Sequence, residues 1–162
     1  MNGFETIEKG GIAYAYLLRA DAASDRTAFL TPDTLNMQLG FVVYKAGTGP
    51  AAHLHRPIER RITGTLELIL VRSGLCDVDV YDDARQLVGS RTMEPGDAVL
   101  LVAGGHGFRM REDTVLLEVK QGPYDPATAS EFAPWAPAEG DGSVARFQRW
   151  LREAQEGGLY SV

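Results

Sequence analysis

The chain has 162 residues, of which 44% are hydrophobic and 23% are charged, a balance typical of one globular domain and unlike a disordered, collagen-like or coiled-coil chain. Its net charge of −6 and its pI of about 5.0 argue against nucleic acids and anionic membranes as partners, because these attract an excess of Lys and Arg. The single cysteine, Cys76, excludes an intramolecular disulfide and a metal site built from several cysteines.

The expected location is the cytoplasm. No apolar run approaches the roughly 20 residues that a membrane-spanning helix needs. The first residues, MNGFETIEKGG, lack the charged-then-apolar pattern of a signal peptide. A chain with one cysteine also suits a reducing compartment.

Short segments rich in Val, Leu, Tyr and Phe, separated by turn-forming residues, fill the first three quarters of the chain. This spacing is typical of an all-β sandwich or barrel. No amphipathic pattern of helix length interrupts the segments, so a parallel β/α architecture is not expected. The predicted strands are residues 12–18, 28–31, 37–45, 51–55, 66–72, 76–81, 86–93, 98–103, 106–111 and 115–121.

The last quarter of the chain has a different character. Residues 122–142 contain four prolines, which predicts an extended, irregular arm. Residues 143–156 then place apolar side chains on one face at helical spacing, which predicts a C-terminal helix. That face packs either on the chain's own β core or on a partner subunit. We therefore expect a β-barrel over residues 1–125, followed by an arm and a helix over residues 126–162.

The three histidines of the chain suggest a metal site. His53 and His55 are two residues apart in a predicted strand, so their rings should point to the same side of a sheet. Imidazole nitrogens suit Zn, Cu, Fe and Ni, although this spacing is also common among surface histidines. His106 begins a later strand that a compact barrel can place opposite the first two. Glu67 interrupts an apolar strand, where a carboxylate must be paired, metal-bound or exposed.

These residues resemble the two sequence motifs of the cupin superfamily. The first motif is matched by Gly47, His53, His55, Glu67 and Gly74, and Gly74 stands at the usual distance from Glu67. The second motif is matched by Gly89, Pro95-Gly96-Asp97 and His106. The resemblance covers residues 35–120. It implies a double-stranded β-helix, or jelly roll, in which His53, His55, Glu67 and His106 bind one metal ion.

The chain departs from the cupin pattern between the histidines and the glutamate. Eleven residues separate His55 from Glu67, where the family usually has three or four. Glu59 stands at the usual distance from His55 and competes with Glu67 for the ligand role. The spacing to Gly74 and the position within a strand favour Glu67. The asparagine often found after the last histidine of the family is Met110 here.

Several other side chains are candidates for the substrate pocket. Strand alternation puts Phe108 and Met110 on the same face as His106, and puts Glu118 and Lys120 together on one face. Glu118 and Lys120 are either a pocket acid and base or the solvated side of an edge strand. Arg60 and Arg61 either clamp a carboxylate or phosphate or lie in a solvated loop. Two tyrosines complete the substrate-binding candidates, namely Tyr44 and Tyr124.

The resemblance implies a metal-dependent enzyme that acts on a small polar metabolite. Zn or Fe is the expected metal, with Mn, Ni or Cu as alternatives, and Glu118 or Glu59 is the candidate for proton transfer. Three reaction types fit: oxidation by dioxygen, isomerisation of a sugar-like substrate, and rearrangement on zinc, including formation of a nitrogen–nitrogen bond. The alternative is a non-catalytic cupin that binds a ligand or docks on a partner. Leu66, Leu68 and Leu70 make the strand of Glu67 apolar on both faces, so that another sheet, the tail or a second subunit must cover the second face, and a homodimer is expected.

Overall fold

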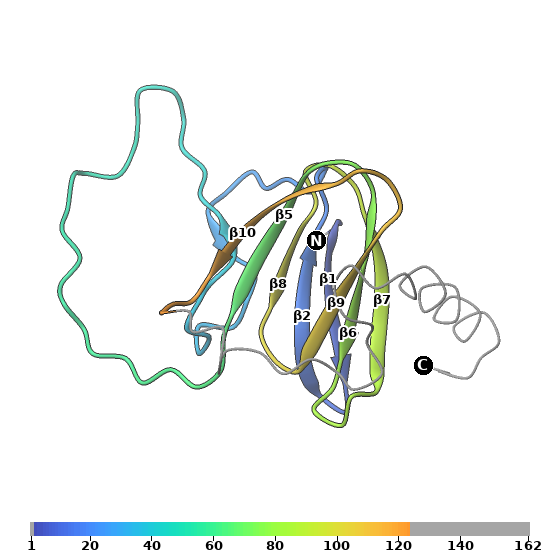
Figure 1. Cartoon of the computed structure of the whole chain (residues 1–162). Helices are drawn as coiled ribbons and strands as arrows, with labels where there is room; N and C mark the ends of the chain where they lie inside the picture. The colour runs from blue at the N-terminus through green and yellow to red at the C-terminus, as the bar shows by residue number, and fades with distance from the viewer. Residues whose placement is uncertain (1, 124–162) are drawn as a thin grey trace.

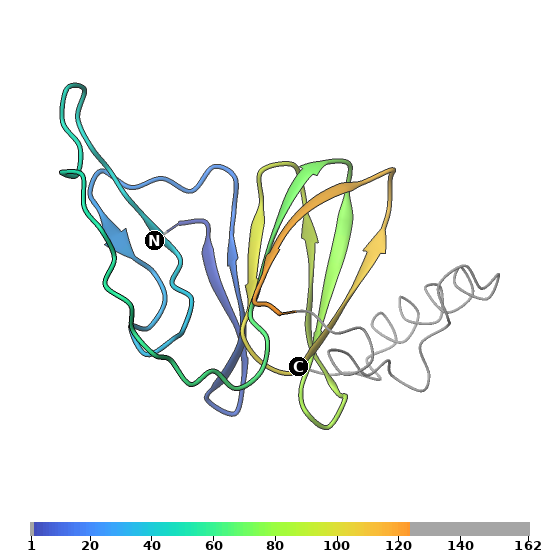
Figure 2. The same ribbon diagram turned by 60° about the vertical axis from the view of Figure 1, so that its left-hand side comes forward.

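The computed structural model describes residues 2–123, which form two antiparallel β-sheets packed face to face (Figures 1 and 2). The larger sheet has the strand order β1-β2-β8-β5-β10, the smaller has the order β7-β6-β9, and β3 pairs with β4 separately. None of the described residues is helical, so the all-β prediction is confirmed. The strands are β1 (Phe4–Lys9), β2 (Ile12–Leu18), β3 (Ala28–Phe29), β4 (Gly40–Phe41), β5 (Glu67–Ser73), β6 (Cys76–Tyr81), β7 (Leu87–Met93), β8 (Ala98–Leu101), β9 (Gly105–Met110) and β10 (Val115–Lys120).

The observed strands differ from the predicted ones in the first half of the chain. The strand predicted at residues 51–55 is wrong, because this segment pairs with no strand among the described residues. The strand predicted at residues 37–45 is reduced to β4. Strand β1 was not predicted, because its sequence FETIEK has few apolar residues, and its pairing with β2 is what holds it extended.

Part of the predicted organisation lies outside the described residues. This applies to the boundary between residues 125 and 126 and to the C-terminal helix at residues 143–156. Within residues 2–123, no helix has the length and hydropathy that crossing a membrane requires.

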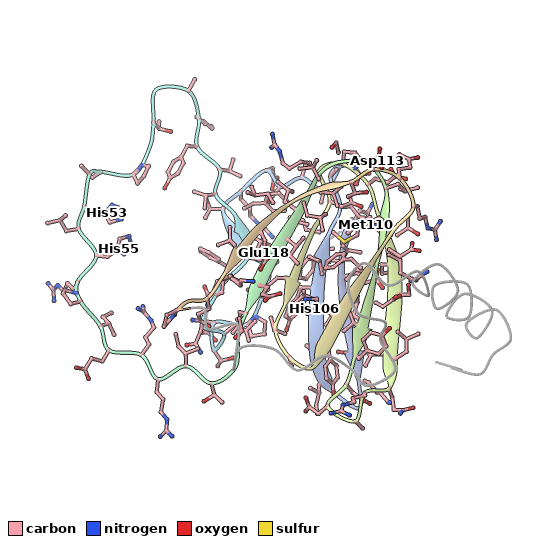
Figure 3. The ribbon with its side chains drawn as sticks, in the orientation of Figure 1. His53, His55, His106, Met110, Asp113 and Glu118 are labelled. Atoms are coloured by element: carbon pink, nitrogen blue, oxygen red, sulfur yellow. The ribbon has the colours of Figure 1, made fainter. Side chains whose placement is uncertain are left out.

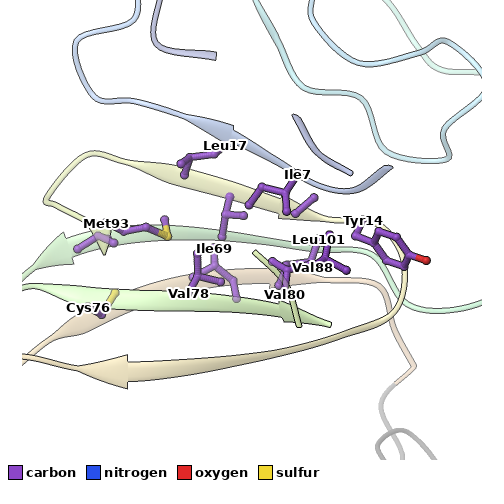
Figure 4. Packing of buried hydrophobic residues seen from close by; sticks show 13 residues of the cluster. Ile7, Tyr14, Leu17, Ile69, Cys76, Val78, Val80, Val88, Met93 and Leu101 are labelled. Atoms are coloured by element: carbon purple, nitrogen blue, oxygen red, sulfur yellow. The ribbon is translucent and has the colours of Figure 1, made fainter. Parts of the chain in front are cut away.

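Alternate residues of the two sheets meet in one hydrophobic core (Figure 4). Ile69 of β5 and Val78 of β6 are both buried there, and burial of such a side chain contributes about 1.5–3 kcal/mol. Leu68 and Leu70 alternate with the inward residues of β5 and so lie on the outer face. The prediction that this strand is apolar on both faces is therefore confirmed, while the homodimer stays a prediction. The core consists of Ile7, Tyr14, Ala15, Leu17, Ile69, Val71, Cys76, Val78, Val80, Val88, Met93, Val99 and Leu101.

The two long sides of the sandwich differ. On one side, β1 and β7 are joined across the sheets by Glu5 and Arg91, whose Nε donates to Glu5 Oε1 at 2.7 Å. On the other side, β9 and β10 are the last strands of their sheets, so each has one edge with no strand beside it among the described residues. An unpaired edge presents backbone N–H and C=O groups that a further strand can satisfy.

The Glu5–Arg91 pair should make stability depend on pH in the acid range. The Arg91 guanidinium lowers the pKa of Glu5 below its usual range, mainly through its hydrogen bonds to that carboxylate. A lowered pKa stabilises the fold above the ordinary Glu value of about 4.3, and this stabilisation is lost as the pH falls through the folded-state pKa. Urea unfolding between about pH 6 and pH 3 should therefore show a smaller loss of stability for Glu5→Gln than for the wild type. Equal losses in the two proteins would contradict this expectation.

Gly74 makes the turn between β5 and β6 possible. Its φ of +86° lies in the left-handed region, and a Cβ at this position would overlap the backbone of Asp113 and Thr114. Gly74→Ala should therefore cost about 2–4 kcal/mol, from backbone strain plus steric overlap. Gly11→Ala is the matched control, because Gly11 has a φ of +79° but no atom within 4 Å of the added Cβ. Gly11→Ala should lower the free energy of unfolding only by the backbone strain of about 1–2 kcal/mol, which the shift of the urea midpoint measures.

Candidate functional site

Glu67 and His106 meet at one end of the sandwich. Glu67 is the first residue of β5 in the larger sheet, and His106 is the second residue of β9 in the smaller sheet. His106 Nε2 lies 3.1 Å from Glu67 Oε2, and the side chains are 32% and 16% exposed. The contact gives the carboxylate of this apolar strand the partner that its position requires. It also brings together a nitrogen and an oxygen donor from two sheets.

Glu118 and Lys120 lie beside this pair on β10. The register places Lys120 opposite Glu67, and Glu118 opposite the buried Ile69, so both point to the inner face of the sheet. This confirms that Glu118 and Lys120 share a face. Lys120 Nζ lies 2.7 Å from Glu118 Oε1, and both side chains are partly exposed. The end of the sandwich therefore carries two carboxylates, one imidazole and one ammonium group (Figure 3).

The surroundings of His106 favour its neutral form. Burial lowers the pKa of His106 below its usual value, and the Lys120 ammonium lowers it further. The Glu67 and Glu118 carboxylates act in the opposite direction but do not outweigh burial. His106 is therefore a neutral imidazole near pH 7, and its contact with Glu67 is a hydrogen bond rather than an ion pair. Neutral imidazole is the form that binds a metal ion.

His53 and His55 lie away from His106. They are on the long connection between β4 and β5, which extends from the sandwich (Figure 3). Their ring centroids are 5.1 Å apart, and His53 Nδ1 lies 2.8 Å from the carbonyl oxygen of Ala51. Within residues 2–123, no group of three or more His, Cys, Asp or Glu side chains is arranged to hold a metal ion. The structure thus forms two separate pairs from the four predicted ligands, namely His53 with His55 and Glu67 with His106.

The remaining predicted site residues are dispersed. Phe108 packs against the core, and its ring contacts that of His106 at a centroid distance of 6.0 Å. Met110 is 46% exposed, although its place in β9 puts it on the same face of the sheet as His106 and Phe108. Tyr44 and Glu59 are exposed on the connection between β4 and β5, and Tyr124 lies outside the described residues. Arg60 and Arg61 line a cavity elsewhere, together with Asp33, Thr34, Leu35, Asn36 and Gln38.

A cluster of buried charges on the outer face of the smaller sheet was not predicted from the sequence. Arg109 donates to both carboxylate oxygens of Asp79, with Nε–Oδ2 and Nη2–Oδ1 distances of 2.6 and 2.8 Å. Asp77 Oδ2 lies 3.1 Å from Arg109 Nη1 and 2.8 Å from Arg111 Nε. The available signal was the two-residue spacing of Asp77 and Asp79 on one strand and of Arg109 and Arg111 on another.

The thiol of Cys76 belongs to the core. Cys76 has no exposed surface, and burial raises its pKa above the usual value. Because the thiolate is the reactive form, this thiol is a packing group and not a nucleophile.

Comparisons with known proteins do not identify a family for this chain. No protein-family model, curated protein or solved structure matches this chain.

Proposed function

We propose that this chain is a mononuclear metal-dependent enzyme of the cupin type, which acts on a small polar metabolite. The observation that carries the proposal is the contact of Glu67 with His106, in which a carboxylate and a neutral imidazole converge from two sheets. Carboxylate oxygen and imidazole nitrogen are ligands that Zn and Fe accept. The H-x-H segment of His53 and His55 supplies the other two imidazoles that such a centre needs.

The connection between β4 and β5 is long enough to complete this centre. At about 3.3–3.6 Å per residue, the chain from His55 to Glu67 spans up to about 40 Å when extended. Among residues 2–123, no strand lies along the outer edge of β9, the strand that carries His106. An extended segment that pairs with this edge would present alternate side chains to the inner face, and two residues of one H-x-H segment alternate in this way. We therefore propose that residues 51–57 dock on β9 when metal binds, and that the fold is then a jelly roll.

The remaining residues of the site suit proton transfer and substrate orientation. A bound divalent metal would supply Lewis-acid chemistry, or, in the case of iron, the activation of dioxygen. Glu118 is the proposed base, because its carboxylate lies next to the Glu67–His106 pair and is open to solvent. Lys120 donates to Glu118 Oε1 and so orients this carboxylate. Glu59 is a second candidate base if the connection docks. Oxidation, isomerisation and rearrangement all need such a base beside a polarised substrate oxygen.

Metal content is the first test of the proposed function. Tag-free protein reconstituted with Zn²⁺ or anaerobically with Fe²⁺ should hold about one ion per chain in elemental analysis, because four ligands from one chain bind a single ion. His106→Ala and Glu67→Gln should lower the affinity at least about 100-fold, since each removes a ligand. Glu112→Gln is the matched control, because Glu112 is an exposed carboxylate close to β10. A reconstituted content far below one ion in the wild type would overturn the proposal.

Turnover separates the enzyme from a binding module. The metal-loaded protein should change the abundance of at least one small polar compound in a metabolite extract, as followed by mass spectrometry with and without dioxygen. His106→Ala and Glu118→Gln should abolish this change, while Glu112→Gln should not. If the protein retains a compound unchanged in every condition, the binding module is the correct assignment instead.

A further inference from the structure

A polar cavity of about 560 Å³ lies between the connection from β3 to β4 and the segment that follows Pro57. This volume is within the range of about 300–1,000 Å³ that is usual for small-molecule sites. The lining contains neither Glu67 nor His106, so the cavity is distinct from the proposed metal centre. It is lined by Asp33, Thr34, Leu35, Asn36, Gln38, Arg60 and Arg61.

One wall of the cavity is held in place by hydrogen bonds. The backbone N–H of Leu30 donates to the carbonyl oxygen of Leu39 at 2.8 Å, which closes the connection between β3 and β4. Thr31 is buried, and its Oγ1 accepts from the N–H of Leu39 at 3.0 Å. The N–H of Leu35 donates to the carbonyl oxygen of Pro32 at 3.1 Å. Residues 33–38 therefore present their polar side chains from a fixed turn rather than from a loose loop.

The opposite wall carries two cations. Arg60 and Arg61 are exposed, and neither guanidinium makes a hydrogen bond or an ion pair within residues 2–123. Thr34 and Asn36 are also in the lining, and their hydroxyl and amide groups are further hydrogen-bond donors. Asp33 is the one carboxylate in the lining, so the two guanidiniums leave a positive balance in a chain whose net charge is −6.

We propose that this cavity binds a small anion with a phosphate or carboxylate head group. Two guanidiniums with free N–H groups recognise either head group through paired, charge-assisted hydrogen bonds. The donors of Thr34 and Asn36 complete the set, and Asp33 accepts a hydrogen bond from a hydroxyl group carried by the same ligand. This inference is independent of the proposed metal centre, because it uses none of its residues.

NMR titration of the EDTA-treated protein tests the cavity separately from the metal. The probes are inorganic phosphate, glycerol 3-phosphate, citrate and neutral glycerol. At least one anion should shift the amide signals of residues 33–38 and 60–61 with a Kd below about 10 mM, while glycerol should not. Binding should weaken as the salt concentration rises, because charges in an open cavity are screened. A preference for glycerol 3-phosphate or for citrate then identifies the head group.

Variants decide whether the two arginines carry the binding. Arg60→Gln/Arg61→Gln should weaken binding at least about tenfold, since it removes both charge-assisted contacts. Asn36→Ala should weaken it less, because it removes one neutral donor. Arg56→Gln is the matched control, because Arg56 is an exposed arginine of the same segment that does not line the cavity. Undetectable binding of all three anions by the wild type, or equal binding by the double variant, would overturn the proposal.

Discussion

Zinc should protect the connection between β4 and β5 from trypsin. Trypsin cleaves after Lys45, Arg60 and Arg61, all of which are exposed on this connection. If residues 51–57 dock on β9 when metal binds, cleavage requires the segment to leave first, and the population of that open form falls with metal concentration. At a zinc concentration of 100 times the Kd, cleavage should therefore slow about 100-fold. The rate is measured by mass spectrometry of the fragments over time.

The ligand residues provide the controls for this experiment. His53→Ala/His55→Ala should be cleaved at one rate with and without zinc, because the docking segment then lacks its metal ligands. Glu67→Gln and Glu59→Gln together identify the carboxylate ligand, since only the variant that removes it should lose protection. Equal cleavage rates of the wild type with and without zinc, at a concentration where zinc is bound, would show that the connection does not dock.

Removing Asp79 should cause a large loss of stability. Asp79 is 1% exposed and Arg109 is 7% exposed, and the two form paired hydrogen bonds on the outer face of the smaller sheet. Asp79→Ala leaves a buried guanidinium without its paired carboxylate, because only the 3.1 Å contact with Asp77 and the hydrogen bond from Nη2 to Ser90 Oγ at 2.9 Å remain. Breaking one side of such a buried pair costs about 3–5 kcal/mol. Chemical denaturation followed by circular dichroism measures the change.

Two further variants separate the lost charge partner from lost packing. Asp79→Ala/Arg109→Met removes both charges, so it should recover a large part of the stability that Asp79→Ala loses. Asp83→Ala changes an exposed aspartate nearby and should alter stability by no more than about 0.5 kcal/mol. If the double variant is less stable than Asp79→Ala alone, the buried charge is not the cause of the loss.

Local sequence patterns were sufficient for the strands that pair with their neighbours. Residues 12–18 and 76–81 were predicted with the bounds that the structure has, because apolar alternation and turn residues are properties of the segment itself. The same alternation correctly placed Glu118 and Lys120 on one face. Glu67 was recognised as a carboxylate that must be paired, metal-bound or exposed, because its neighbours in the strand are all apolar.

Pairing between distant segments could not be inferred in this way. The H-x-H segment has the alternation of a strand, yet a strand exists only where an edge accepts its hydrogen bonds, and residues 51–55 pair with none among the described residues. Strand β1 shows the converse. Its own composition does not predict a strand, but β2 supplies an edge with which its backbone pairs. The buried pair of Asp79 and Arg109 likewise depends on the register of β6 with β9.

The sequence by itself therefore determined the all-β class, most of the strands to within about two residues, and the residue types suited to a metal centre. Only the tertiary structure decided that His106 contacts Glu67, that His53 and His55 lie apart from them, and that Arg60 and Arg61 line one cavity with residues 33–36 and 38. The physical reason is the range of the interactions. Alternation and turn formation act within a few residues, whereas a binding site depends on which edges and faces distant segments share.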